Sequence, residues 1–312
     1  MTILIGLSSL PFLHELILDN DGNPFSWVPN FHIAETLTTE NGRVWGYSKY
    51  HVLMYFLLIQ LYTLIAWIGW FTVAKNKKYR LAILMGVASS AYHLILIVFN
   101  SRKTNFNNAD IKLISTAIIG ILLFLIYYYY AKKREEKLQH ALDHFGHAKN
   151  KLISVKLLLS WAVIFCISTG PYLHDIITVS GKGVTDWVPQ LGMVEFLTDT
   201  SSGKVWGFNS YRIFLLTISL HVFAQIAWAG WLHDAIYKLY RPFLLVPVGL
   251  SLYQIIVMLL DKTDAYLNRP NIKLLMILFL GSIICYFYFF KNKRFESKII
   301  DASEVSQTAQ SD

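Results

Sequence analysis

The sequence predicts an all-α membrane protein built from two tandem, parallel four-helix units. Three observations carry this prediction: the composition, the length of the apolar blocks and an internal repeat. Of the 312 residues, 54% are hydrophobic and only 15% are charged, whereas an ordinary soluble domain carries about 25% charged residues. The mean hydropathy is +0.42. Both cysteines, Cys166 and Cys285, lie inside apolar blocks, which excludes a small secreted domain held by disulfides.

Seven apolar stretches are long enough to cross a bilayer, for which about 20 residues are needed. They cover 52–74, 81–99, 112–131, 153–172, 212–232, 242–260 and 273–290. An eighth block, 1–17, is shorter. No basic residue precedes it and no small-residue cleavage site follows it, so we interpret it as a retained short membrane helix. The sequence therefore predicts seven to eight transmembrane helices.

The basic residues gather in the loops on one side of the predicted spans. Those loops and the tail hold 17 of the 28 Lys and Arg residues. The positive-inside rule places this side, with the C-terminus, in the cytoplasm of an inner or plasma membrane. The same cations suit anionic lipids at the cytoplasmic face of the bilayer. Because we find no folded basic surface outside the spans, the pI of 9.2 does not indicate nucleic-acid binding.

The second half of the chain repeats the first at an offset of 160, which becomes 161 near residue 202. Matched segments include 11–15 and 171–175, 27–29 and 187–189, 44–46 and 205–207, 65–70 and 226–231, and 111–113 and 272–274. Each unit holds four membrane blocks, an even number, so the two copies enter the membrane from the same side. The repeated Trp-x-Gly-Trp motif predicts close helix packing.

The repeat also predicts how the chain divides. The expected parts are a first membrane unit over 1–131, a basic cytoplasmic linker over 132–152, a second membrane unit over 153–290 and a disordered cytoplasmic tail over 291–312. In each unit, the first helix ends near Pro-x-Leu-His-acid and a long outer segment follows it. The middle of that segment, 31–39 in one unit and 191–199 in the other, predicts a short interfacial helix.

Polar residues that both units retain concentrate on the outer side. They are His14 and His174, each followed by an acid, and Glu35 and Glu195. Histidine with a carboxylate can bind a divalent metal, relay protons or bind a polar ligand. Three interpretations stay open. The His-acid pairs cap interfacial helix ends, the four residues form one pseudo-symmetric pocket, or each unit holds its own site.

Positions that differ between the units can hold a single site. His221 and Gln225 stand four residues apart on one predicted helix face, inside a span. His93 and Asp261 are further polar positions that differ between the copies. Polar side chains inside a span usually face the bundle interior or a cavity. Interhelical hydrogen bonding and ligand or ion binding are both open for these residues.

A cluster of histidines lies in the predicted linker. His140, His144 and His147 share one face of a helix, a spacing that can bind a transition metal. A solvated amphipathic connector is the alternative. A membrane desaturase or hydroxylase would need several such histidine boxes, and the sequence has one. The sequence identifies no cofactor and no protein partner beyond the lipid bilayer.

Three functional classes remain for a chain of this kind. We favour a protein that moves an ion or small solute along a pathway between the repeats, since tandem repeats commonly build such pathways. The second class is a membrane-embedded enzyme with an outward-facing His/acid site that acts on a lipid or an exported molecule. The third is a non-catalytic subunit that docks a partner through its outer loops. Because G-x-S-x-G, Walker A, Rossmann and H-E-x-x-H motifs are absent, whether the protein is an enzyme stays open.

Overall fold

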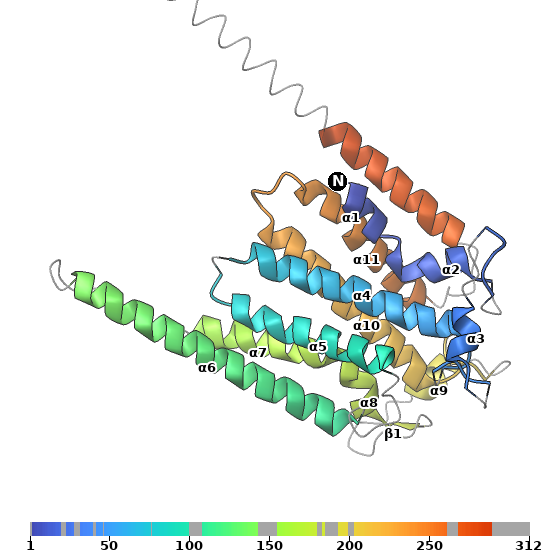
Figure 1. Ribbon diagram of the computed structural model, residues 1–312, viewed down its shortest axis with the longest axis horizontal. Coiled ribbons are helices and arrows are strands. Elements are labelled where there is room, and N and C mark those ends of the chain that lie inside the picture. The colour runs from blue at the N-terminus through green and yellow to red at the C-terminus, as the bar shows by residue number, and fades with distance from the viewer. Residues whose placement is uncertain are drawn as a thin grey trace, which may run out of the picture.

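The protein is all-helical apart from one short β ladder, and seven of the described helices are long and apolar enough to cross a membrane. This computed structural model (Figure 1) describes residues 2–19, 23–27, 32–39, 42–45, 47–75, 77–99, 108–142, 155–179, 183–184, 193–198, 203–260 and 268–288. A chain with seven such helices is a polytopic membrane protein.

The long helices run side by side (Figure 1). They are α4 (Tyr50–Val73), α5 (Arg80–Val98), α6 (Ala109–Leu142), α7 (Val155–Thr169) continued by η4 (Gly170–Tyr172) and α8 (Leu173–Ile177), α10 (Tyr211–Asp234), η5 (Arg241–Leu244) followed by α11 (Leu245–Leu259), and a C-terminal helix, Pro270–Tyr288. The apolar spans begin and end within five residues of the predicted blocks. Helix α6 continues to Leu142, so it includes the start of the predicted linker. The remainder of that linker, 143–154, and the predicted tail lie outside the described residues.

The N-terminal block forms a short helical segment, as predicted. It consists of α1 (Thr2–Leu7), η1 (Leu10–Phe12) and α2 (Leu13–Ile17). Proline has no backbone N–H and disrupts an α-helical ladder, and Pro11 stands inside the 3-10 turn that separates α1 from α2. In Figure 1, α1 begins beside the middle of α4, so this segment accompanies only part of the bundle's length.

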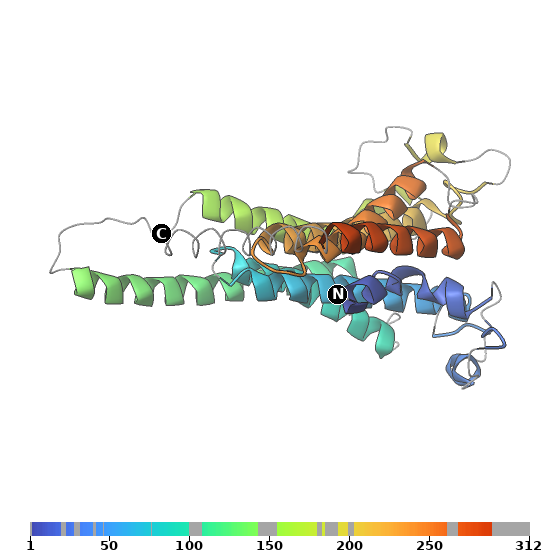
Figure 2. The same ribbon diagram turned by 90° about the horizontal axis from the view of Figure 1, so that it is seen from above.

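The long connections gather at one end of the bundle, which we call the α3/α9 end. It holds α3 (Ile33–Leu37), α9 (Met193–Leu197) and the ladder of β1 (Thr178–Val179) with β2 (Gly183–Val184). Helices therefore lie in both segments where the sequence predicts them. In Figure 2, α3 and α9 diverge to opposite sides of the molecule. The opposite end, where α4 turns into α5 and α10 into α11, is the hairpin end.

Helices α4 and α10 pack closely at the centre, as the Trp-x-Gly-Trp motif predicts. A Cβ atom placed on Gly69 would lie 2.2 Å from the ring of Trp231, and one placed on Gly230 would lie 2.5 Å from the ring of Trp70. Each tryptophan ring therefore occupies the space above a glycine of the opposite helix. A residue without a side chain is required at both positions, because it permits this close approach.

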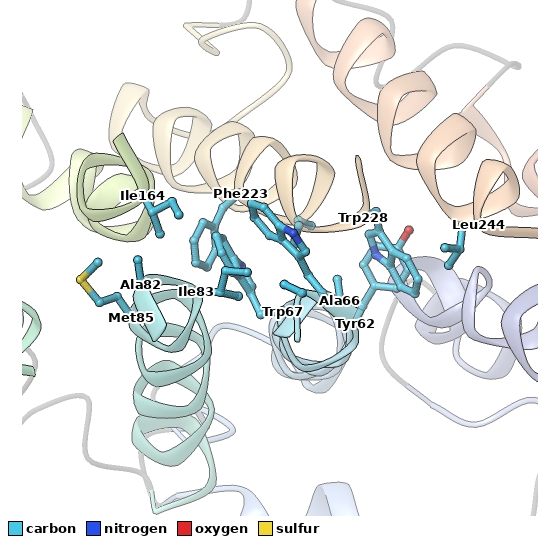
Figure 3. Packing of buried hydrophobic residues seen from close by; sticks show 14 of the residues in the cluster. Tyr62, Ala66, Trp67, Ala82, Ile83, Met85, Ile164, Phe223, Trp228 and Leu244 are labelled. Carbon is cyan, nitrogen blue, oxygen red and sulfur yellow. The ribbon is translucent and has the colours of Figure 1, made fainter. Parts of the chain in front are cut away.

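A row of buried aromatic side chains fills the space between α4 and α10 (Figure 3). The ring centroids of Trp67 and Phe223 are 4.9 Å apart, and those of Tyr62 and Trp228 are 5.0 Å apart. The Tyr62 hydroxyl donates a hydrogen bond to the Pro247 carbonyl oxygen at 2.9 Å. Because Tyr62, Trp67 and Trp228 are all 0% exposed, side chains fill the space between α4 and α10 at this level.

The two halves of the chain are connected crosswise. Helix α1 packs against α11, whereas α7 packs against α5 and α6. Phe12 of the N-terminal segment shares a buried cluster with Val246, Leu250 and Ile277 from near the end of the chain. The first helical segment of each half is therefore packed against later helices of the other half.

Several local conformations recur at positions one repeat apart. Trp45 and Trp206 both adopt left-handed backbone, with φ of 48° and 47°. The Arg80 Nε donates to the Phe71 carbonyl oxygen at 3.3 Å, and Arg241 donates to Leu232 in the same way at 3.2 Å. These matches show that the corresponding segments fold alike locally.

Candidate functional site

Two buried lysines form ion pairs at the α3/α9 end. Lys112, near the start of α6, places Nζ 2.7 Å from Oδ2 of Asp175 on α8. Lys273, near the start of the C-terminal helix, places Nζ 3.1 Å from both carboxylate oxygens of Glu15 on α2. Both lysine side chains are 3% exposed. Ionisable groups at membrane depth are energetically costly and are functional candidates for that reason.

The two ion pairs share one plan. An aromatic ring three residues before each acid lies close to the lysine: Lys112 Nζ is 5.8 Å from the ring centroid of Tyr172, and Lys273 Nζ is 5.7 Å from that of Phe12. These distances fall within the range of cation–π attraction. Each lysine belongs to one half of the chain and its acid to the other, so both pairs bridge the halves.

The Asp175 carboxylate has two further partners. Arg212, at the start of α10, donates from Nη2 to Oδ1. His174 places Nε2 3.1 Å from the same oxygen, while its Nδ1 lies 2.9 Å from the Pro171 carbonyl oxygen. Asp175 therefore holds the cationic side chains of Lys112 and Arg212 close together, with the His174 ring beside them.

These residues line a cavity of about 160 Å³, which we call the wide cavity. The lining residues with polar groups are Tyr47, Gln60, His93, Lys112, His174, Asp175 and Arg212. Gln60 is 2% exposed, and its Oε1 accepts no hydrogen bond from the described residues. The His93 ring stacks on Tyr172 with centroids 5.0 Å apart. About 15 Å³ of such volume holds one water, so the wide cavity has room for a small solute.

The Glu15–Lys273 pair borders a narrow cavity of about 30 Å³. Its other polar lining residues are Ser8, Tyr55, His221, Ser251 and Gln254. Tyr55 fills part of this space and places its hydroxyl 2.9 Å from His221 Nε2. The matched residue in the wide cavity is Leu216, which has no hydroxyl. The narrow cavity has room for about two waters.

The structure distributes the predicted site residues between these cavities and the surface. His174 and His93 line the wide cavity, and His221 lines the narrow one. His14 is buried beside the narrow cavity's acid, with its ring centroid 4.5 Å from that of His51. Gln225 lies in α10 but lines neither cavity, and its Oε1 has no hydrogen-bond partner among the described residues.

Glu35 and Glu195 lie away from both cavities. Glu35 is exposed on α3, with Oε2 2.5 Å from His32 Nδ1, and Glu195 is exposed on α9. Since α3 and α9 diverge (Figure 2), the structure does not bring His14, Glu35, His174 and Glu195 into one pocket. The histidines lie in two separate places, each beside its own acid.

The remaining candidates fall at the edge of the described structure. Asp261, His144 and His147 lie outside the described residues. His140 belongs to α6, but the described structure does not include its side chain. Among the residues that the structure does describe, no group of three or more His, Cys, Asp or Glu side chains could hold a metal ion.

Sequence reasoning missed three of the site's cations. Lys112 and Lys273 stand in the matched Ile-Lys-Leu segments, so the repeat contains a signal for them. A lysine at the end of an apolar block usually marks only a span boundary, however. Their acids lie 63 and 258 residues away, and no pattern in the sequence reports that proximity. Arg212 has the same boundary position and went unnoticed for the same reason.

A second polar cluster joins the halves at the hairpin end. The Asp234 side chain is 0% exposed and accepts hydrogen bonds from Trp70 Nε1 at 2.8 Å and from the Tyr79 hydroxyl at 2.8 Å. Lys77 Nζ lies 3.8 Å from it. The residue 161 positions before Asp234 is Val73, which has no carboxylate. Burial, and then the neighbouring Asp234 carboxylate, raise the pKa of Tyr79.

This raised pKa predicts a loss of stability at alkaline pH. An unperturbed tyrosine ionises near pH 10. The unfolded chain therefore releases the Tyr79 proton at lower pH than the folded protein does, and folding stability falls as pH rises above about 10. We expect Tyr79→Phe to flatten that fall in a thermal melting series of the detergent-solubilised protein. Tyr240→Phe, at the matched position, is the control. An unchanged alkaline slope in Tyr79→Phe would contradict this assignment.

The chain was also compared with known proteins. It matches no protein-family model, no curated protein and no solved structure. The features that bear on function are therefore the two charge pairs, their cavities and the packed interface between α4 and α10.

Proposed function

We propose that this polytopic membrane protein is a tandem duplication that moves an ion or small solute across the membrane, binding it beside the charge pairs. The observation that carries this proposal is the pair of buried lysine–carboxylate contacts, Lys112–Asp175 and Lys273–Glu15, at membrane-helix ends. Removing such charges from water is costly. Within membrane proteins, paired ionisable groups commonly mark ion and substrate pathways.

The duplication is supported by the shared plan of the two sites. Each has a lysine from the fourth helix of one unit, an acid from the first helix of the other, and an aromatic ring near the lysine. The crosswise packing of the units and the reciprocal tryptophan–glycine contacts fit an approximate two-fold axis between α4 and α10. Parallel repeats are related by an axis of this kind, along the membrane normal.

Transport by alternating access is supported by polar contacts at both ends of the interface. The charge pairs close the α3/α9 end, the Asp234 cluster closes the hairpin end, and the aromatic row lies between them. All of these contacts join the two halves. Rocking of one half against the other would open one end while the other stays closed. The packed centre favours such a carrier over an open channel.

The enzyme alternative receives less support from the lining of the wide cavity. Among the described residues that line it there is no Ser, Thr or Cys, so no serine, threonine or cysteine nucleophile for covalent catalysis is available among them. The hydroxyl in that lining is the phenol of Tyr47. The docking alternative requires a flat aromatic surface on the outer connections. The polar residues that we place in the cavities do not contribute to such a surface.

Uptake into proteoliposomes tests the proposal. We expect radiolabelled uptake of an anion, a neutral solute or a cation, with acetate, glycerol and rubidium as probes, to exceed uptake into empty liposomes and to saturate with concentration. The double variant Glu35→Gln/Glu195→Gln is the control and is expected to keep this uptake, since both acids are exposed and distant from the cavities. If none of the three probes enters faster than into empty liposomes, the transport proposal fails.

A further inference from the structure

We propose that the wide cavity binds a small monocarboxylate that carries a hydroxyl group and a short apolar chain, as a 2-hydroxy acid does. The inference deepens the transport proposal by naming a class of solute. Its transport step rests on that proposed function, whereas its binding step can be measured without any transport. The charge, the size and one hydrogen-bonding group of the cavity support the inference separately.

The charge of the wide cavity favours an anion. Lys112 and Arg212 line it together with Asp175, the one carboxylate among its described lining residues. Over these described residues the sum is one positive charge, with His93 and His174 counted as neutral. Lys112 and Arg212 share the single Asp175 carboxylate, and a bound monoanion would give the part-exposed Arg212 guanidinium a second acceptor. The narrow cavity differs, because Lys273 and Glu15 balance each other there.

The size and the apolar lining of the wide cavity favour a ligand with a short hydrocarbon chain. At about 15 Å³ for each water, 160 Å³ corresponds to about ten waters, enough for a solute of about six non-hydrogen atoms with some hydration. The apolar part of the lining consists of Phe56, Leu96, Ile97, Ile213, Leu216 and Leu220. A ligand with a charged end and a short apolar end matches both parts. The Arg212 side chain is 35% exposed, which gives a charged approach from the α3/α9 end.

Gln60 favours a hydroxyl on the ligand. Gln60 lines the cavity, and its buried Oε1 accepts no hydrogen bond from the described residues. A buried acceptor without a donor is costly. A carboxylate has no donor to offer, whereas a hydroxyl has one. At the matched position in the narrow cavity, His221 Nε2 lies 2.9 Å from the Tyr55 hydroxyl. The polar atom there therefore already has a hydrogen-bond partner from the protein.

Calorimetric titration of the purified full chain in detergent tests the binding step with three probes. L-lactate has the carboxylate and the hydroxyl, propionate lacks the hydroxyl, and lactamide lacks the charge. We expect lactate to bind about tenfold tighter than propionate, since one hydrogen bond to a buried acceptor is worth roughly that factor. Lactamide is expected not to bind, because it leaves the cavity's positive charge without a partner.

Two variants separate the contribution of the cavity's positive charge to lactate binding from that of the hydrogen bond to Gln60. Arg212→Gln is expected to weaken lactate binding at least about tenfold, and Lys112 still neutralises Asp175 in that variant. Gln60→Leu is expected to bind lactate and propionate equally. It should melt at or above the wild-type temperature, because it removes an unpaired buried polar atom. His51→Gln is the matched control for position 212 and is expected to leave lactate affinity unchanged.

The outcomes separate this inference from the transport proposal. The inference is overturned if lactate does not bind, if lactamide binds as tightly, or if Arg212→Gln binds lactate as the wild type does. Lactate binding without lactate uptake into proteoliposomes supports the site and contradicts transport. Uptake of rubidium or glycerol without any lactate binding supports transport and overturns the monocarboxylate site.

Discussion

Lys273→Met is expected to lower the free energy of unfolding by about 3 kcal/mol, because Glu15 then stays largely buried without its counter-charge. The loss is measurable by denaturant or thermal unfolding of the detergent-solubilised protein. Lys112→Met, at the matched position, is expected to cost less, since Arg212 still binds Asp175 there. This comparison within one chain separates the loss of a charge partner from the loss of a lysine side chain.

The double variant Lys273→Met/Glu15→Leu is expected to recover most of that stability. Replacing both members of a buried ion pair by apolar residues is often neutral, whereas removing one partner is strongly destabilising. Equal losses in Lys273→Met and Lys112→Met would contradict the assigned role of Arg212. A double variant as unstable as Lys273→Met would show that the pair matters for packing rather than for charge balance.

Gly69→Ala is expected to be strongly destabilising. The added Cβ would lie 2.2 Å from the ring of Trp231, well inside van der Waals contact, and α4 and α10 would have to separate. Overpacking typically costs about 1–3 kcal/mol and occasionally more. We expect a large drop in melting temperature and, because the helices at the interface no longer fit, reduced solute uptake.

Two controls accompany this variant. A Cβ on Gly249 would lie 3.4 Å from Leu280, at the near edge of ordinary contact, so Gly249→Ala in α11 is expected to be tolerated, aided by the higher helix propensity of alanine. Trp231→Leu added to Gly69→Ala is expected to restore part of the stability by making space. If Gly69→Ala melts like Gly249→Ala, the tryptophan ring does not lie on this glycine.

The spans and the close helix packing could be predicted because their signals are local. An apolar block of about 20 residues can be identified as a span from its own sequence. The Trp-x-Gly-Trp motif puts a tryptophan ring next to a glycine, which has no side chain, on the same helix. The residues of the two cavities differ in this respect. Lys112 and Lys273 stand in similar Ile-Lys-Leu segments, and each pairs with an acid from the other half of the chain. Similarity between two segments does not report which residues are in contact.

The unequal sizes of the two cavities could not be predicted from the sequence either. They depend on which side chain fills the space, Tyr55 in one case and Leu216 in the other. Both residues belong to apolar helices and neither is distinctive there. His14 and His174 were identified correctly as polar residues near helix ends. Their separation into two places follows from the crosswise packing of the helices, which no spacing along the chain encodes.

The crosswise pairing has a consequence for biosynthesis. Lys273 is synthesised 258 residues after Glu15. At about 5–20 residues per second, Lys273 is synthesised roughly 13–50 s after Glu15. Throughout that interval the N-terminal segment carries an uncompensated negative charge, so it has to stay near water or beside the insertion machinery. The helix Pro270–Tyr288 therefore has to be synthesised before the segment that holds Glu15 can be buried with its charge paired.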